Sequence, residues 1–230
     1  MTARSFTLAD PASLDDLQVF LARAQRVEDG SVRLIGGSGV LAVYAAVLYP
    51  VGLLDETPTV LGLRTLALAS RDQFDVVVPI RSLLLRVERA QQLAVEAIAA
   101  GRDEAVAVGL PMEVHTATWA AISPPRGGWR AVPSIEAAVL DGVATGGIAE
   151  IAEAVPDAVG ESIVRRVRAE VWGRETPGFE HIPAGASFAA LSLGFLGDDP
   201  VKVYETGPWT RLTTQRGHVL VKRRAWTLSR

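Results

Sequence analysis

Residues 31–48, SVRLIGGSGVLAVYAAVL, contain the strongest indication of the fold. Two runs of strand-forming residues, 31–35 and 40–48, flank the glycine-rich sequence Gly36-Gly37-Ser38-Gly39, which is typical of a turn. The second run is apolar at both alternating sets of positions, a pattern that favours a central strand covered on both faces. The stretch therefore predicts a β-hairpin at the start of an antiparallel or mixed sheet.

Helices and further strands are predicted around this hairpin. Ser13 and Asp16 are spaced like a capping box, and apolar residues then recur at helical spacing, so 13–27 is predicted to be an amphipathic helix. A long helix is expected over 82–100, ended by Gly101. Three more runs have the composition or alternation of strands: Thr59–Ala69, Phe74–Ile80 and Met112–Ile122.

The composition changes at the proline- and glycine-rich residues 124–128. Helical patterns follow at 135–140, 148–155, 161–172 and 186–196, with a loop at 177–183. Three strand-like pieces then end the chain: Lys202–Thr206, Trp209–Thr213 and His218–Lys222. We therefore predict an α+β protein in which residues 1–125 form a sheet domain backed by a long helix. Residues 126–230 form a helical domain that ends in a basic β-hairpin or meander, either separate from the first domain or packed with it as one unit.

Composition excludes several classes of protein. The chain of 230 residues is 49% hydrophobic and 21% charged, which is typical of a folded globular protein. It has no cysteine and three histidines, so disulfides, thiol nucleophiles and cysteine-ligated metals are excluded, and we predict no metal and no cofactor. The longest apolar run, 40–54, is interrupted by Pro50 and Gly52, and no secretory signal is recognised. A cytoplasmic protein without a membrane segment is expected.

Charge is distributed unevenly along the chain. Residues 202–230 hold seven basic residues and one acid, a net charge of +6, which leaves −9 for residues 1–201 because the entire chain is −3. Such asymmetry indicates where an acidic partner could dock. The candidate partner-binding residues are Lys202, Trp209, Arg211, Arg216, Lys222, Arg223 and Arg224.

No catalytic motif withstands a check of its context. Gly36-Gly37-Ser38-Gly39 lacks the Gly-Lys-Ser/Thr ending and the following helix of a phosphate-binding loop, so a hairpin turn is the better interpretation. His181 follows Glu180 on a loop flanked by prolines, but a catalytic base there would need a nucleophile that the sequence does not identify. We therefore predict no catalytic residues and a protein that is not an enzyme, with a hydrolase using His181 and Glu180 as a minor alternative.

The tryptophans of the basic segment allow two interpretations. Trp209 and Trp226 lie beside Arg211 and Arg224 and could stack on single-stranded nucleic acid. They could instead close the segment onto its own domain, which the large buried area of tryptophan favours. The order helix, helix, hairpin also resembles a winged helix, but the second helix has no Arg, Lys, Asn or Gln to contact DNA.

The C-terminal sequence Phe195-Leu196-Gly197, Pro200–Val203, Gly207-Pro208-Trp209 and Arg211-Leu212 resembles the end of an uncharacterised protein family of actinomycetes. The N-terminal helix followed by a short meander is also similar. The resemblance implies a cytoplasmic bacterial protein and no particular activity.

Two functions from different classes follow from these patterns. The first is a non-enzymatic binding or adaptor protein that uses a protein partner or self-association, including a homodimer, through a sheet edge or an apolar helix face. The alternative is binding of nucleic acid or another polyanion through the basic C-terminal hairpin, in a manner like a winged helix.

Overall fold

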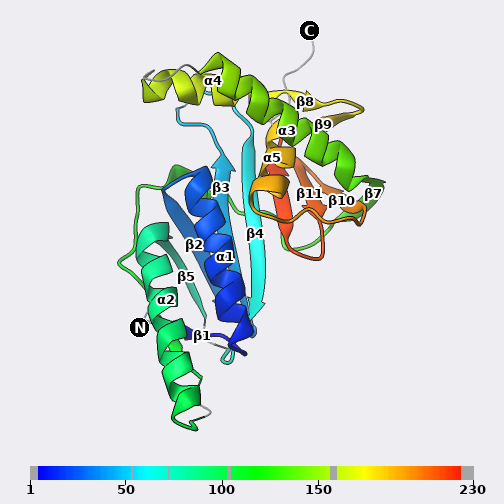
Figure 1. Ribbon diagram of the computed structural model, residues 1–230. Coiled ribbons are helices and arrows are strands. Elements are labelled where there is room, and N and C mark those ends of the chain that lie inside the picture. The colour runs from blue at the N-terminus through cyan, green and yellow to red at the C-terminus, as the bar shows by residue number, and fades with distance from the viewer. Residues whose placement is uncertain (1–4, 53, 72, 103–104, 156–159, 224–230) are drawn as a thin grey trace. The chain divides into compact units, whose positions relative to one another are not determined.

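The computed structural model describes residues 5–52, 54–71, 73–102, 105–155 and 160–223, and it combines helices with antiparallel strands (Figure 1). The predicted α+β class is confirmed. The chain forms two compact units, Met1–Ala45 with Leu63–Ala120 and Ala46–Gly62 with Ala121–Arg230. It passes from one to the other at three points: within β3 (Val40–Leu48), within β4 (Thr59–Ala67) and after Ala120. The boundary expected between residues 125 and 126 remains a prediction.

The strands of the first unit follow the order β5-β2-β3-β4, with β2 at Ser31–Gly37 and β5 at Phe74–Pro79. Ser38 and Gly39 form the turn between β2 and β3 and have φ angles of 54° and 80°. Positive φ at both central residues is what a two-residue type I′ hairpin turn requires, so the predicted hairpin is confirmed. Burial alternates along the first half of β3 and is continuous from Ala45 to Leu48, so only the second half is covered on both faces.

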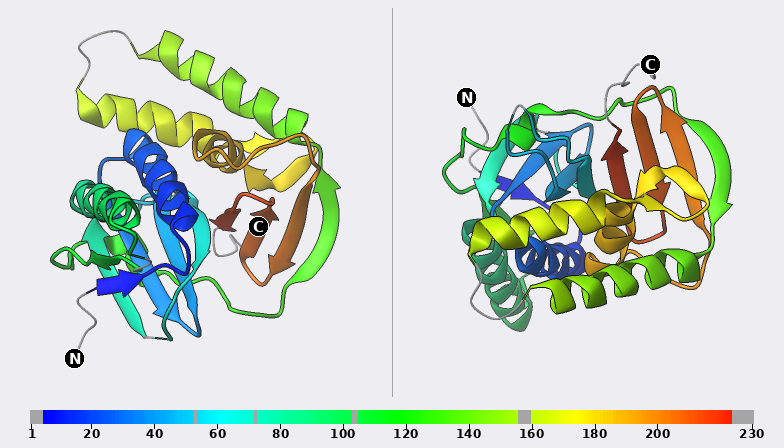
Figure 2. Two further views of the ribbon diagram at one scale, coloured as in Figure 1. Left: turned by 60° about the horizontal axis from the view of Figure 1, so that its bottom comes forward. Right: turned by 90° about the horizontal axis from the view of Figure 1, so that it is seen from above.

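Two helices, α1 (Ala12–Val27) and α2 (Ile80–Ala99), pack against each other on the same side of these strands (Figures 1 and 2). Both agree with the predicted helices to within two residues. The start of α1 differs in detail: the N-cap residue is Pro11, and Ser13 donates hydrogen bonds to Asp10, the residue before Pro11. Asp10 accepts hydrogen bonds from the Ser13 backbone N–H at 2.9 Å and the Ser13 hydroxyl at 2.7 Å. Asp16, the expected second member of a capping box, instead pairs with Arg64 on β4.

The fifth strand predicted at 112–122 is wrong. The segment holds a 3₁₀ turn at Thr118–Ala121, and the nearest strand is the short β6 (Ala107–Gly109), which pairs with β1 (Ser5–Thr7). Val114 donates one backbone hydrogen bond to Val77, at 2.7 Å. Apolar and polar residues can also alternate in a segment that lies along a sheet without pairing with a strand. Alternation alone therefore could not distinguish such a segment from a strand.

The second unit contains a sheet with the strand order β12-β11-β10-β7 together with three helices. Its strands are β7 (Arg130–Ile135), β10 (Val201–Thr206), β11 (Trp209–Thr213) and β12 (His218–Lys222). Its helices are α3 (Ala137–Ala154), α4 (Glu161–Gly173) and α5 (Ala184–Ser192). A small hairpin joins β8 (Glu175–Thr176) to β9 (Phe179–Pro183). The three strands predicted from residue 202 onward are confirmed.

Other predictions for this half are corrected. Residues 130–135 form β7 instead of leading directly into a helix, and Pro133 is tolerated because β7 is the last strand in the sheet order, where proline need not donate to a neighbour. One continuous helix, α3, replaces the two pieces expected at 135–140 and 148–155. Part of the loop expected at 177–183 is the strand β9.

Helix α5 occupies the interior of the second unit. It contacts α3, α4, β9 and β12, and six of its residues are buried. A recognition helix must present one side to a DNA groove, so the burial of α5 removes the winged-helix arrangement. Among the described residues, no helix is both long and apolar enough to cross a membrane.

Candidate functional site

The pairing of the last three strands brings their basic residues together. Tyr204, Arg211 and Leu220 lie directly opposite one another on β10, β11 and β12. Lys202 is two residues from Tyr204, and Lys222 is two residues from Leu220. Residues two apart on a strand point to the same side of the sheet, so Lys202, Arg211 and Lys222 share one face. We call this side of β10–β12, defined by these three cations, the basic face.

The opposite face of the same strands is packed along its length, whereas on the basic face only Leu220 and Trp209, at 2% and 4% exposed, are buried. Val203, Leu212 and Val219 form one row across the packed face and are each at most 3% exposed. Glu205 and Thr210 form part of the next row, and Thr210 is fully buried. Glu205 is the only acid in the three strands, so the register separates the acid from the three cations. The basic face keeps its positive charge because of this alternation.

Arg211 lies at the centre of the basic face, beside two aromatic rings. Its guanidinium carbon is 4.5 Å from the centre of the Trp129 ring and 4.7 Å from the centre of the Tyr204 ring. Burial lowers the pKa of Arg211. The electrostatic interaction with Tyr204 acts in the opposite direction and raises this pKa. The Nε nitrogen is buried, and no hydrogen-bond acceptor for it occurs within the described ranges. The side chain is therefore held by rings rather than by oxygen atoms.

The loop before β7 places Trp129 in this position. The Trp129 indole N–H donates to the carbonyl oxygen of Pro125 at 3.1 Å, which folds the loop on itself. Gly128 has a φ of 76°, and a Cβ there would lie 3.3 Å from the Thr206 hydroxyl on β10. Glycine thus permits the bend that brings the tryptophan over the sheet.

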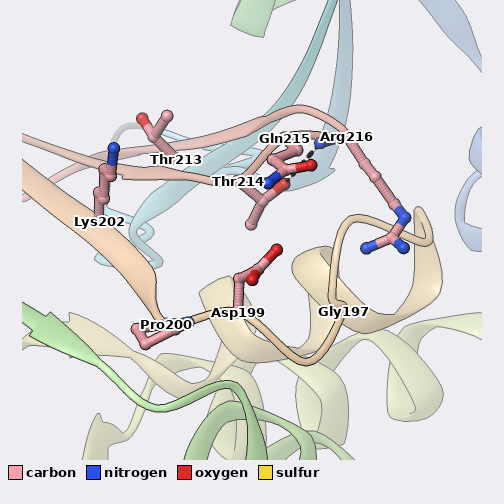
Figure 3. Close-up of a pocket in the computed structure, with 8 residues that line it drawn as sticks. All are labelled: Gly197, Asp199, Pro200, Lys202, Thr213, Thr214, Gln215 and Arg216. Atoms are coloured by element: carbon pink, nitrogen blue, oxygen red, sulfur yellow. Dashed lines mark hydrogen bonds between the residues drawn. The ribbon is translucent and has the colours of Figure 1, made fainter.

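A pocket of about 160 Å³ adjoins Lys202 at one end of the basic face. Figure 3 shows Lys202 and Arg216 on opposite sides of it, with the Asp199 carboxylate between them. The remaining lining residues come from the turn before β10, the end of β11 and the turn after it: Gly197, Pro200, Thr213, Thr214 and Gln215. Two cations and one carboxylate give the pocket a mixed charge, which suits a polar segment that carries groups of both signs.

Contacts within the chain fix Arg216 beside this pocket. The Thr214 hydroxyl accepts hydrogen bonds from the backbone N–H groups of Arg216 at 3.1 Å and Gly217 at 3.2 Å. The Arg216 guanidinium donates to the carbonyl oxygen of Leu196 at 3.3 Å. A Cβ at Gly197 would lie 2.1 Å from the same guanidinium, so glycine leaves room for the arginine. The carbonyl is neutral, and the charge of Arg216 therefore remains uncompensated by this contact.

The other predicted binding residues have different environments. Trp209 is 4% exposed, so it contributes to packing and offers no ring to a partner at the surface. The Arg223 guanidinium donates to the carbonyl oxygen of Gly207 at 2.8 Å. The backbone N–H of Arg223 donates to the carbonyl oxygen of Pro208. Arg224 and Trp226 lie outside the described residues. The residues that the sequence interpretation missed are Trp129, Tyr204 and Asp199. The two-residue spacing of Lys202 and Tyr204 in a predicted strand was the signal that could have placed Tyr204 on the basic face.

Glu180 and His181 lie on β9, and His181 points toward β10. The His181 Nε2 atom is 3.8 Å from Glu205 Oε1, and Glu205 also accepts a hydrogen bond from Arg130 at 3.3 Å. This contact lies between the β8–β9 hairpin and strand β10. No group of three or more histidine and carboxylate side chains in the described part of the chain is placed to hold a metal ion.

The described strands thus form an α+β scaffold that presents a basic face beside a mixed-charge pocket. The chain belongs to a family described as a domain of unknown function, DUF8010, which matches residues 1–118. A second domain of unknown function, DUF8185, matches residues 124–226. The expected membership of an uncharacterised family is confirmed, and no curated protein matches the chain.

Solved structures of bacterial sliding clamps are similar to this chain at low sequence identity. The DNA polymerase sliding clamp of Caulobacter crescentus has a TM-score of 0.49 at 12% identity, over 97% of this chain and 67% of the clamp. The DnaN sliding clamp of Bartonella birtlesii bound to griselimycin has a TM-score of 0.48 at 11% identity, over 98% and 66%. A Helicobacter pylori beta clamp bound to a DNA ligase peptide has a TM-score of 0.43 at 9% identity, over 98% and 68%. The chain spans about two thirds of the length of these clamps.

Proposed function

We propose that this protein is a non-enzymatic binding protein that docks an acidic surface of a protein partner on its basic face. The observation that carries the proposal is the strand register, which places Lys202, Arg211 and Lys222 on one side and Glu205 on the other. Clustered charge of one sign speeds association with an oppositely charged surface and disfavours like-charged partners. The mixed-charge pocket beside Lys202 adds a feature that a protein surface, with charges of both signs, can match.

Three features favour a protein over nucleic acid as the partner. The rest of the chain is strongly acidic, with −9 over residues 1–201, and would repel an extended polyanion. Trp209 is buried, and the rings of Trp129 and Tyr204 lie against Arg211. Binding of single-stranded nucleic acid relies on ring faces that are free to stack on bases. Asp199 also adds a negative charge next to Lys202 in the pocket.

The test is recovery of partners with the tagged full-length chain from nuclease-treated lysate of the source organism, followed by mass spectrometry. The double variant Lys202→Glu/Lys222→Glu reverses two cations of the basic face and should lose the partner. The matched control Arg89→Glu/Arg166→Glu makes the same change in net charge at exposed positions on α2 and α4 and should retain it. A partner set that is unchanged in the first variant would overturn the proposal.

Nucleic-acid binding is the second candidate, and the observation that favours it is the group of three cations, Lys202, Arg211 and Lys222, on one face, where they could contact phosphates. It predicts affinity for mixed nucleic acids that falls steeply with added salt and is lost when Arg211, Arg216, Lys222 and Arg223 become alanine. Electrophoretic mobility shifts at several salt concentrations measure this directly. Salt-dependent binding together with an empty protein pull-down would favour this candidate over the first.

Self-association and catalysis are tested separately. Light scattering on the purified chain gives its mass and so detects a homodimer. The hydrolase alternative requires His181, so an activity screen should give the same result for the unaltered chain and for His181→Ala. A hydrolytic signal that disappears in His181→Ala would contradict the non-enzymatic proposal.

A further inference from the structure

We infer that Arg211 is the residue of the basic face that binds a carboxylate, the side chain of an aspartate or glutamate on the partner protein. This inference rests on the proposed function and names the group that the basic face recognises. It concerns one guanidinium and the two aromatic residues that hold it, Trp129 and Tyr204.

The rings fix the guanidinium without using its hydrogen-bond donors. Both ring centres lie within 4.7 Å of the Arg211 guanidinium carbon, a distance at which the ring electrons attract the cation. An arginine head carries five N–H donors in a fixed plane, and their preferred acceptors are oxygen atoms. Contacts with Trp129 and Tyr204 therefore orient the head while its capacity to bind an oxygen pair is retained. Because the side chain is already oriented before binding, less side-chain conformational entropy is lost when a partner binds.

Comparison with the neighbouring arginines distinguishes Arg211. Arg130 donates to the Glu205 carboxylate, Arg216 to the Leu196 carbonyl and Arg223 to the Gly207 carbonyl. Arg211 has no such oxygen acceptor among the residues that the structure describes, although the Nε atoms of Arg211 and Arg223 are both buried without a partner. Partial burial has already removed some of the water around the Arg211 head, so a hydrogen bond from its remaining N–H groups to an incoming oxygen gains more than it would at a fully hydrated arginine.

The surroundings of Arg211 select an anion. Lys202 and Lys222 are its diagonal neighbours on β10 and β12, and no acid from these strands shares their face. A carboxylate presents two oxygens in one plane, which match two parallel N–H donors of a guanidinium. The two lysines raise the local positive potential, while Arg211 supplies the directional contact. A carboxylate on a folded partner is favoured over a phosphate chain, because residues 1–201 carry a net charge of −9 and would repel an extended chain of phosphates.

The experiment uses the full-length chain and a fluorescently labelled hexaglutamate peptide at low salt, with hexaglutamine as the uncharged control. Fluorescence anisotropy should show binding of hexaglutamate and none of hexaglutamine. Arg211→Gln should weaken the binding about thirtyfold, the loss typical of a central binding residue. Arg211→Lys keeps the charge but loses the planar fork, so it should weaken binding about tenfold. Lys222→Gln, which removes one charge at the same face, should weaken it about threefold.

Each outcome decides the inference. Equal affinities for Arg211→Lys and the unaltered chain would overturn it, because charge alone would then explain binding. Competition by hexathymidylate at lower concentrations than unlabelled hexaglutamate would also overturn it in favour of phosphate. Trp129→Phe keeps a ring beside Arg211 and should retain most of the affinity, whereas Trp129→Ala should lose several-fold. Equal binding by these two tryptophan variants would contradict the role of the ring.

Failure of this inference and failure of the proposed function give different results. If Lys202→Glu/Lys222→Glu loses the lysate partner while Arg211→Gln binds hexaglutamate normally, the proposed function stands and the role of Arg211 does not. If Arg211→Gln loses hexaglutamate but no lysate protein depends on the basic face, the carboxylate site stands and the proposed partner class does not. Circular dichroism of each variant confirms that a loss is not caused by unfolding.

Discussion

Arg33 in the N-terminal strands and Arg211 in the C-terminal meander are both partly buried arginines on antiparallel strands, but different groups hold them. Arg33 on β2 donates to both oxygens of Asp75 on β5, at 2.7 and 2.6 Å, and to the carbonyl oxygen of Ala120 at 2.8 Å. The pKa of Arg33 is raised, chiefly by its hydrogen bonds to Asp75. Its own chain therefore supplies the oxygens that the guanidinium needs.

Arg211 has the opposite environment. Its guanidinium lies beside the rings of Trp129 and Tyr204, and burial lowers its pKa. A side chain whose donors are satisfied internally stabilises the fold, and one whose donors are left for an external oxygen is suited to binding. The comparison teaches that the acceptors around an arginine, and not its burial, distinguish a structural role from a binding role.

The largest effect on stability is expected for Arg33→Ala. The substitution removes the bidentate contact with Asp75 and the bond to Ala120, and it should lower the free energy of unfolding by about 2–4 kcal/mol. Asp75 is half exposed, so water screens its attraction to Arg33 and limits the loss of stability. Urea unfolding measures the change. Arg81→Ala is the control, since Arg81 is 74% exposed and 3.3 Å from Asp29, and it should change stability by less than about 1 kcal/mol.

A smaller effect on stability is expected for Arg211→Gln. Loss of the contacts with Trp129 and Tyr204 is offset by removal of a buried N–H that has no acceptor within the described chain, so the free energy of unfolding should change by less than about 1 kcal/mol. The same urea titration gives the answer. A loss as large as that of Arg33→Ala would make Arg211 a structural residue and break the comparison.

The smallest effect concerns an acid that its own chain satisfies, Asp10 at the start of α1. The Ser13 hydroxyl and the Ser13 backbone N–H lower the pKa of Asp10. Because the folded-state pKa is depressed, the stabilisation is present above the unfolded-state pKa and is lost as the pH falls through the folded-state pKa. Ser13→Ala should raise the pKa of Asp10 toward its usual value, as measured by NMR titration of the Asp10 carboxyl carbon. An unchanged titration would show that the backbone N–H alone is responsible.

Local patterns predicted the elements that form from neighbouring residues. The hairpin around Ser38 and Gly39, the helix over 13–27 and the three C-terminal strands all follow from turn chemistry and periodicity. The strand predicted at 112–122 failed, because alternation describes one face of a chain but does not supply a neighbouring strand. The strand β7 was missed because Pro133 indicates a break unless the strand is known to be at the sheet edge.

Some features of the candidate site could likewise be predicted from the sequence, and others could not. The uneven charge, with +6 over residues 202–230, is a property of the sequence and indicated which segment carries the candidate binding residues. Tertiary structure alone decided that Trp209 is buried, that Trp129 lies beside Arg211 and that Asp199 lies between Lys202 and Arg216 at a pocket. The physical reason is that charge and periodicity are local quantities. The acceptors around a guanidinium come from residues far apart in the chain, and only strand register and loop geometry bring them together.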